Sequence, residues 1–199
     1  MSTTHKSASR GRPRRFDPDE AVAQAQCLFH ERGYDGVSVA DLTQALGIKP
    51  PSFYAAFGSK LELYQRVLER YVSHGALPLQ QILEAELPLA VTLAQVLEEA
   101  ARSYAADPAA AGCLVLEGTH CDDPQARAAA DVYHQAAQAL IQTHIAARHP
   151  HRAQELADFV VTSMAGLSAS ARHGQSLERL LASARLAGLA LTQSLPADL

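Results

Sequence analysis

Hydrophobic side chains recur along this chain every three or four residues, the spacing at which they share one face of an α-helix. No stretch alternates with the period of two that is typical of a half-buried β-strand. Proline and glycine fall between the periodic segments, where helices begin and end. The pattern therefore predicts an all-α protein.

Signals for helix ends divide the chain further. Asp17 and Pro18 supply a cap and a first-turn proline for a helix that ends before Gly33. Ser59 and Glu62 predict the start of another helix, from residue 60 to about 75. Further apolar stripes predict helices near residues 89–104, 124–148, 152–173 and 176–195.

The stretch from residue 38 to 64 predicts two short helices joined by a tight turn and followed by a third. Ser38 and Asp41 suit a capping box, and Gly47 suits the left-handed conformation of a sharp helix exit. The second short helix, about 51–57, is predicted to bury Phe53 and Phe57. This is the geometry of a helix-turn-helix, whose second helix enters the major groove of DNA. Its predicted outer face comprises Lys49, Pro50, Ser52, Tyr54 and Ala55.

The residues around this motif resemble the N-terminal signature of the TetR family of transcriptional regulators, over roughly residues 16–64. The run F-Y-x-x-F-x-S-K is the most specific part of the resemblance. The matching residues are Leu28 to Tyr34, Val37 to Leu42, Gly47, Ile48, Phe53, Tyr54, Phe57, Ser59 and Lys60. The resemblance implies a DNA-binding domain at residues 16–64 and a helical domain for ligand binding and dimerisation at residues 65–199.

The distribution of charge along the chain supports an N-terminal DNA-binding domain, whereas the net charge alone does not. The formal net charge is −4, but residues 1–60 hold 8 basic and 6 acidic side chains, against 9 and 15 in the remainder. Residues 1–15 contain five cations and no acid, without periodicity, which predicts a disordered basic arm. Its arginines suit a narrow minor groove.

The predicted DNA contacts combine this arm with the helix-turn-helix. Lys60 lies at a helix start, where free N–H groups and the helix dipole already attract phosphate. The sequence departs from the family pattern at Lys49, where a capping serine is usual, and at Ala55 and Ala56, where a polar or aromatic residue is usual. The full predicted set is Arg12, Arg14, Arg15, Ser38, Lys49, Pro50, Ser52, Tyr54 and Lys60.

The second domain is expected to hold a mainly apolar organic ligand and to form a homodimer. The resemblance implies that the last two helices pair with their copies in a second subunit, and their leucines and small residues suit such a bundle. The predicted dimer residues are Phe159, Met164, Leu167, Leu177, Leu181, Ala184 and Gly188. The predicted ligand pocket comprises Leu93, Leu97, Tyr104, Cys113, Leu116, Glu117, His120, Tyr133 and His134.

Other functions remain open at this point. Cys113, His120 and Cys121 would be the sensing residues of a thiol- or metal-responsive regulator, although Asp122 and Asp123 disfavour a thiolate beside them. An architectural DNA-binding protein would lack a ligand cavity. The sequence contains no phosphate loop, metalloprotease motif or nucleophile motif, so we expect no enzyme and no cofactor.

The expected compartment is the cytoplasm. Three cysteines at unrelated spacings argue against a disulfide framework. The basic N-terminus is not followed by the apolar segment of a signal peptide, and no apolar run is long enough to span a bilayer. The expected partners are double-stranded operator DNA, a small-molecule effector and a second copy of the chain, with no membrane.

Overall fold

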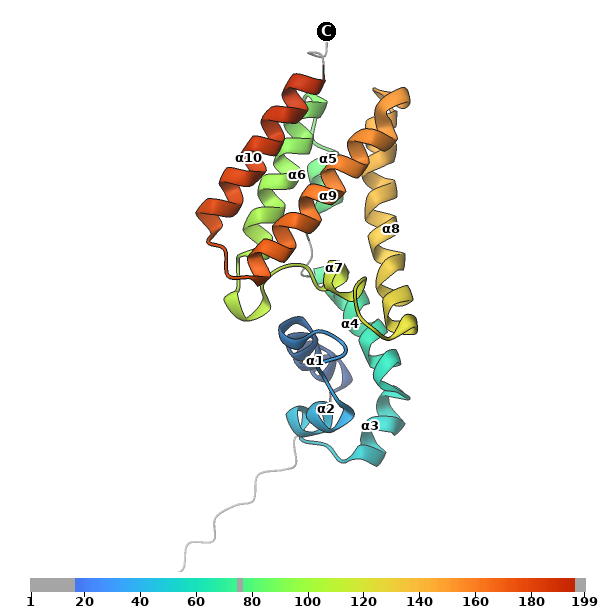
Figure 1. The fold of residues 1–199 in the computed structure, drawn as a ribbon. Helices are drawn as coiled ribbons and strands as arrows, with labels where there is room; N and C mark the ends of the chain where they lie inside the picture. Colours follow the sequence, from blue (N-terminus) through green and yellow to red (C-terminus); the bar gives the residue numbers. More distant parts are fainter. Residues whose placement is uncertain (1–16, 75–76, 196–199) are drawn as a thin grey trace, which may run out of the picture.

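The computed structural model describes residues 17–74 and 77–195. Within these ranges the chain forms ten α-helices and two 3-10 segments and contains no strand, which confirms the predicted all-α class (Figure 1). No helix in the described part is long and apolar enough to cross a membrane. The elements are α1 (Pro18–Arg32), α2 (Val39–Leu46), α3 (Pro50–Phe57), α4 (Lys60–His74), α5 (Leu79–Leu83), α6 (Leu89–Tyr104), η1 (Pro108–Ala110), α7 (Leu114–Gly118), α8 (Pro124–Ala146), η2 (Pro150–Arg152), α9 (Ala153–Arg172) and α10 (Leu177–Ser194).

Helices α1 to α4 enclose a core rich in aromatic rings. Phe29 and Tyr34 lie against Tyr64, with ring centroids 5.1 and 4.9 Å apart. Phe53 and Phe57 are fully buried, as their spacing predicted, and lie 5.5 Å from each other. Large rings that touch edge to face fix the relative orientation of the helices that carry them. This core therefore holds α3 in a defined position.

The turn between α2 and α3 forms as the sequence predicted. The Ser38 hydroxyl accepts a hydrogen bond from the Asp41 backbone N–H at 3.1 Å, and the Asp41 carboxylate accepts from the Ser38 N–H at 2.8 Å. Gly47 takes the left-handed conformation, with φ 64° and ψ 28°. A residue with a side chain rarely adopts this conformation, so glycine permits the sharp exit from α2. Lys49 precedes α3 without a side-chain cap.

A second core lies at the other end of the molecule, around α6. This helix packs against α9 and α10, and its Leu93 and Leu97 are fully buried between them (Figure 1). The apolar stripe that predicted α6 is therefore a stripe of the subunit's own interior.

Helix α8 contributes to both cores. Ala126 and Ala130, in its first turns, belong to the aromatic core of α1 to α4. Ile141 and Ile145, farther along, belong to the core around α6. A single helix of 23 residues therefore packs against both cores, and Figure 1 shows it extending from the level of α4 past α9.

Candidate nucleic-acid interface and internal cavity

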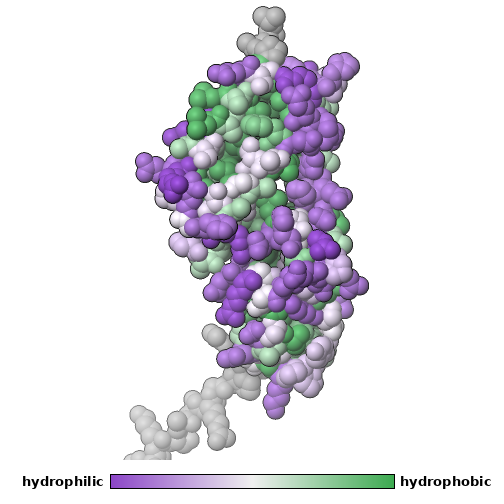
Figure 2. Space-filling model, in the orientation of Figure 1, coloured by the Kyte–Doolittle hydropathy of each residue, from purple (hydrophilic) through white to green (hydrophobic). Residues whose placement is uncertain are grey.

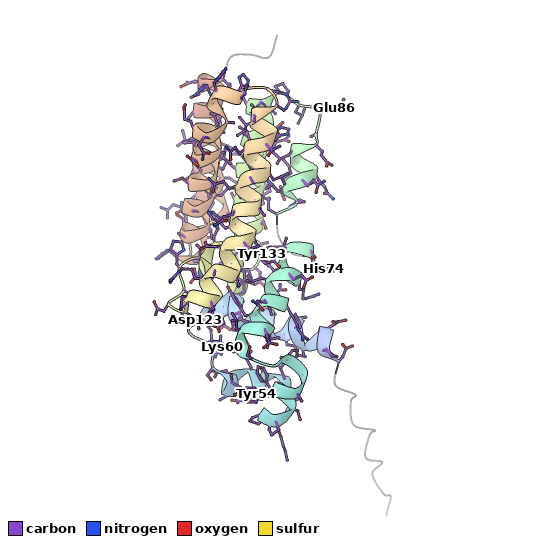
Figure 3. The ribbon with its side chains drawn as sticks, turned by 90° about the vertical axis from the view of Figure 1, so that its right-hand side faces the viewer. Tyr54, Lys60, His74, Glu86, Asp123 and Tyr133 are labelled. Atoms are coloured by element: carbon purple, nitrogen blue, oxygen red, sulfur yellow. The ribbon has the colours of Figure 1, made fainter. Side chains whose placement is uncertain are left out.

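Helix α3 presents an exposed face at the end of the molecule opposite α10. Lys49, Pro50 and Ser52 are exposed, and the Tyr54 side chain is 52% exposed although it follows buried Phe53. Figure 3 shows Tyr54 at this end. A major groove admits an α-helix, and side chains of this kind hydrogen-bond to base edges and phosphates. The placement suits a DNA contact, which stays a prediction for these residues.

Two other predicted DNA contacts have partners inside the subunit. The Ser38 hydroxyl is occupied by the capping box of α2. The Lys60 ammonium lies 3.8 Å from the centroid of the Tyr34 ring. Burial lowers the pKa of Lys60, and the carboxylates of Asp35 and Asp123 oppose that shift. Contact of Ser38 and Lys60 with DNA stays a prediction. Arg12, Arg14, Arg15 and the basic arm lie outside the described residues.

A cavity of about 840 Å³ lies between α4, α5, α8 and α9. Five of the predicted pocket residues line it: Tyr104, Cys113, Leu116, Tyr133 and His134. In Figure 3, His74 at the end of α4 and Tyr133 on α8 lie on either side of this region. Sequence reasoning missed the contributions of α4 and α5, among them Tyr71, His74, Gln80 and Glu84. The spacing of apolar residues in α4 and α5 predicts which face of each helix is buried. It does not reveal that this face borders a cavity.

Four predicted pocket residues do not line the cavity. Leu93 and Leu97 fill the core beneath α6, because that helix is covered on two sides by α9 and α10. Glu117 points instead to Arg172, with its Oε2 atom 3.1 Å from the Nε of Arg172. His120 is exposed, and its Nδ1 lies 3.0 Å from the Leu116 carbonyl oxygen. The structure therefore does not bring these four residues to the cavity, and a ligand contact for them stays a prediction.

The deepest part of the cavity is formed by two phenols and a thiol. Tyr71 and Tyr104 are almost fully buried, and both hydroxyls contact the Cys113 thiol. Burial raises the pKa of all three groups, because a charge there would lose its hydration. All three are therefore neutral at neutral pH.

The predicted sensing group of Cys113, His120 and Cys121 is not assembled as one site. Cys113 lines the cavity, whereas Cys121 belongs to the aromatic core of the N-terminal helices. Burial, together with Asp35 and Asp123, raises the pKa of the Cys121 thiol. Among the described residues, no group of three or more His, Cys, Asp or Glu side chains could hold a metal ion.

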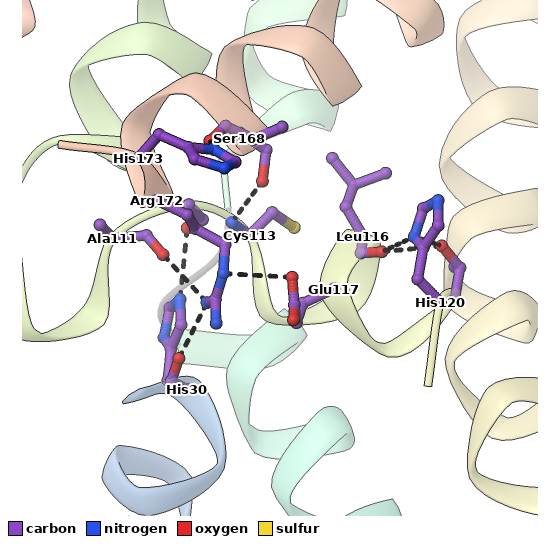
Figure 4. A network of polar contacts seen from close by, with 12 residues as sticks. His30, Ala111, Cys113, Leu116, Glu117, His120, Ser168, Arg172 and His173 are labelled. Carbon is purple, nitrogen blue, oxygen red and sulfur yellow. Dashed lines mark hydrogen bonds and ion pairs between the residues drawn. The ribbon is translucent and has the colours of Figure 1, made fainter. Parts of the chain in front are cut away.

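A polar junction joins α1 to the helices that border the cavity (Figure 4). The Arg172 Nη1 atom, at the end of α9, donates to the carbonyl oxygens of His30 at 2.9 Å and Ala111 at 3.3 Å. Its Nε atom binds Glu117 of α7. His30 is buried, which lowers its pKa, and its Nε2 lies 3.3 Å from the Gly112 carbonyl oxygen. No sequence pattern marked Arg172, because its partners are 55 to 142 positions away.

The predicted dimer residues divide into inward-facing and outward-facing groups. Leu167, Ala184 and Gly188 are buried in the subunit's own core, so they do not form the surface of the last two helices. Leu181 packs partly on the same core, and Met164 lines the cavity. Ala184 and Gly188 lie on the small-residue face of α10, which α6 covers, so they offer little surface to a second subunit. The dimer contacts of these residues stay predictions.

The outward face of α9 and α10 carries several large apolar side chains. Phe159 on α9 and Leu177, Leu186 and Leu189 on α10 are exposed, and the exposed fractions of Leu186 and Leu189 are 68% and 58%. The dimer contacts of Phe159 and Leu177 stay predictions. Figure 2 shows hydrophobic residues over the region where Figure 1 places α9 and α10. Exposed apolar side chains that lie together mark an interaction surface. We refer to Phe159, Leu186 and Leu189 as the α9–α10 face.

Two glycines on the last helices should respond differently to substitution. A Cβ at Gly188 would lie 2.9 Å from the Cβ of Ala94, whereas a Cβ at Gly166 would meet nothing within 4 Å. We expect Gly188→Leu to lower the free energy of unfolding by about 1–3 kcal/mol, the range for an overpacked core. Gly166→Leu is the matched control and should leave the midpoint in urea nearly unchanged. Equal midpoints for the two variants would contradict the inward packing of Gly188.

Known proteins share features of this sequence and this fold. The model for bacterial regulatory proteins of the tetR family matches residues 22–67. The HTH-type transcriptional repressor BdcR of Escherichia coli is 52% identical over 96% of this chain and 97% of BdcR. The repressor ComR of the same organism is 32% identical over 90% of this chain and 91% of ComR. A TetR family regulator, CifR, solved as a cysteine mutant with 26-bp operator DNA, superposes with a TM-score of 0.81, at 33% identity over 90% of this chain and 99% of CifR.

Proposed function

This chain belongs to the TetR family of bacterial regulatory proteins, and we propose that it is a homodimeric transcriptional repressor that a small molecule releases from a palindromic DNA operator. The observation that carries the proposal is the exposed face of α3, held on an aromatic core and joined by α4 to a cavity. Its relatives BdcR and ComR are named repressors, and CifR was solved with operator DNA.

In this proposal the exposed face of α3 binds the operator and recognises its sequence. Each subunit would place α3 in the major groove of one half-site, with the two helices about 34–36 Å apart along the duplex. Tyr54 would contact phosphate and so position the helix, whereas Lys49 and Ser52 would contact base edges and so specify sequence. Arg12, Arg14 and Arg15 of the N-terminal arm are proposed to lie in the adjacent minor groove.

Helix α4 supplies the connection between ligand and DNA. Tyr71, near its end, borders the cavity, while Arg66, nearer its start, lies 5.5 Å from the ring of Phe57 in α3. A ligand that fits the cavity better when α4 is displaced would therefore shift the spacing of the two α3 helices. Only a difference in affinity between the two states produces such a shift.

The other functional classes have less support. A cavity of this size is not required of an architectural DNA-binding protein, and it falls in the range of small-molecule sites, about 300–1,000 Å³. Members of the family are transcriptional regulators, so we propose no catalytic activity. A regulator of chromosomal operators acts where the DNA is, so we place the protein in the cytoplasm.

Substitutions on α3 test its proposed role in operator recognition. We expect Lys49→Ala and Ser52→Ala to change base preference at single operator positions, by about 1–3 kcal/mol for a good contact. Tyr54→Phe and Lys60→Ala should weaken binding to all operator variants by similar factors. The measurement is a mobility-shift series on an inverted repeat and its single-base variants at two salt concentrations.

Arg148→Ala is the control, since it removes an exposed cation beyond the end of α8, far from α3 and outside the α9–α10 face. It should leave both affinity and base preference unchanged. If Lys49→Ala and Ser52→Ala keep the wild-type order of preference across all variants, the assignment of α3 as the sequence reader fails.

A further inference from the structure

The cavity is polar at its floor and partly apolar along its walls. Its floor consists of the neutral hydroxyls of Tyr71 and Tyr104 and the thiol of Cys113. Its walls contain aliphatic side chains from α5, α7, α8, α9 and the segment before α5, beside polar side chains such as those of Gln80, Gln81 and Gln138. The aliphatic residues are Leu77, Leu79, Leu116, Ile141, Val161 and Met164. The part of a ligand that lies against them is removed from water.

No lysine or arginine is among the described residues that line this cavity. The only carboxylate of the lining is Glu84, exposed on α5. It accepts a hydrogen bond from the Gln80 amide at 2.8 Å. Glu69, close enough to influence Tyr133, adds a second negative charge nearby. Among the described side chains that line the cavity, the one permanent charge is therefore negative.

An organic anion would be poorly accommodated in these surroundings. A carboxylate, sulfonate or phosphate needs a cation or several N–H donors to offset its lost hydration. The described lining offers hydroxyl, thiol and amide groups, which hydrogen-bond to uncharged ligands without a comparable desolvation penalty. His74 and His134 also line the cavity, and an imidazole ring can donate or accept a hydrogen bond.

We propose that the effector is an uncharged, largely apolar small molecule with one or two hydrogen-bonding groups, and that the cavity excludes organic anions of the same shape. This inference rests on the proposed function, since it assigns a chemical class to the ligand of that cavity. The hydrogen-bonding end of the ligand meets Tyr71, Tyr104 and Cys113, and its apolar body lies along the aliphatic walls.

Two dyes that differ by one sulfonate test the charge selectivity directly. The neutral dye N-phenyl-1-naphthylamine and the anionic 1-anilinonaphthalene-8-sulfonate share the same ring framework and fluoresce more strongly in apolar surroundings. Titration at about pH 8, where ordinary histidines are neutral, should give the neutral dye a Kd at least about tenfold lower than that of the anion.

Substitutions locate the binding and reverse its preference. Ala137→Trp fills the cavity from α8 and should abolish binding of the neutral dye, whereas Ala139→Trp, an exposed position of the same helix outside the lining, should not. Glu84→Lys replaces the carboxylate with an ammonium group at an exposed site. It should lower the ratio of the anionic dye's Kd to the neutral dye's Kd severalfold. A mobility shift with operator DNA checks that each variant is folded and functional.

The outcomes separate this inference from the proposed function. Equal affinities for the two dyes, both abolished by Ala137→Trp, would overturn the charge selectivity and leave the ligand cavity standing. Absence of binding by either dye to protein that still binds its operator would overturn both the inference and the cavity's role as an apolar ligand site. Loss of operator binding by the wild-type protein under every condition would overturn the proposed repressor function itself.

Discussion

Replacing Arg172 with methionine is expected to lower the free energy of unfolding by about 2 kcal/mol, because it leaves two carbonyl oxygens and one carboxylate without their donor. The Arg172 side chain is only 22% exposed, so water replaces the lost hydrogen bonds poorly. Methionine keeps much of the aliphatic volume, which limits the loss of packing. The measurement is equilibrium unfolding in urea.

Substitutions of Glu117, the ion-pair partner of Arg172, and of a control arginine test this expectation further. Glu117→Gln should have a smaller effect, up to about 1 kcal/mol, since Glu117 is 38% exposed and its charge is screened by solvent. Arg185→Met removes another arginine, 63% exposed and 3.8 Å from Glu98, and should have almost no effect. If Arg172→Met unfolds at the same urea concentration as Arg185→Met, the junction does not stabilise the fold.

Glutamate at both Leu186 and Leu189 is expected to convert the protein to monomers at micromolar concentration. Each leucine buried in a dimer contributes about 1.5–3 kcal/mol, and a two-fold axis brings each substitution into the interface twice. Both side chains are more than half exposed in the subunit, so its own core should tolerate the change. Sedimentation velocity measures the oligomeric state, and circular dichroism checks the fold.

Operator binding should fall with dimerisation, because a monomer reads one half-site and loses the contribution of the second. Val132→Glu is the control. Val132 is 64% exposed on α8 and lies outside the α9–α10 face. It should leave both the dimer and operator affinity intact. A double variant that still sediments as a dimer would show that the subunits associate through another surface.

The helices and the turn at α3 could be predicted because their signals are local. The capping box of Ser38 and Asp41, the left-handed Gly47 and the proline start of α1 each depend on neighbours within four positions. Phe53 and Tyr54 fell on the expected sides of α3 for the same reason. The relatives reported above confirm the resemblance to a known family. The division into two domains that the resemblance implied stays a prediction.

The cavity and the dimer surface were harder to predict, because periodicity identifies a buried face but not what covers it. Leu93 and Leu97 have the spacing of pocket residues, yet α9 and α10 enclose them. Gly188 is small enough to allow close packing at a subunit interface, yet it packs against Ala94 of the same chain. Arg172 had no local signal at all, since its carbonyl partners belong to distant segments.

The sharing of α8 between the two cores bears on how the chain folds. Ala126 and Ala130 complete the aromatic core of the N-terminal helices, and Tyr71, beyond residue 64, belongs to it as well. A fragment that ended at residue 64 would leave Phe29 and Tyr64 without part of their cover and expose a row of rings to water. We therefore expect the N-terminal helices to be less stable as a separate fragment than in the whole chain. The contacts of Ala126 and Ala130 become available only after about two thirds of the chain has been synthesised, so we expect this core to be completed late in synthesis.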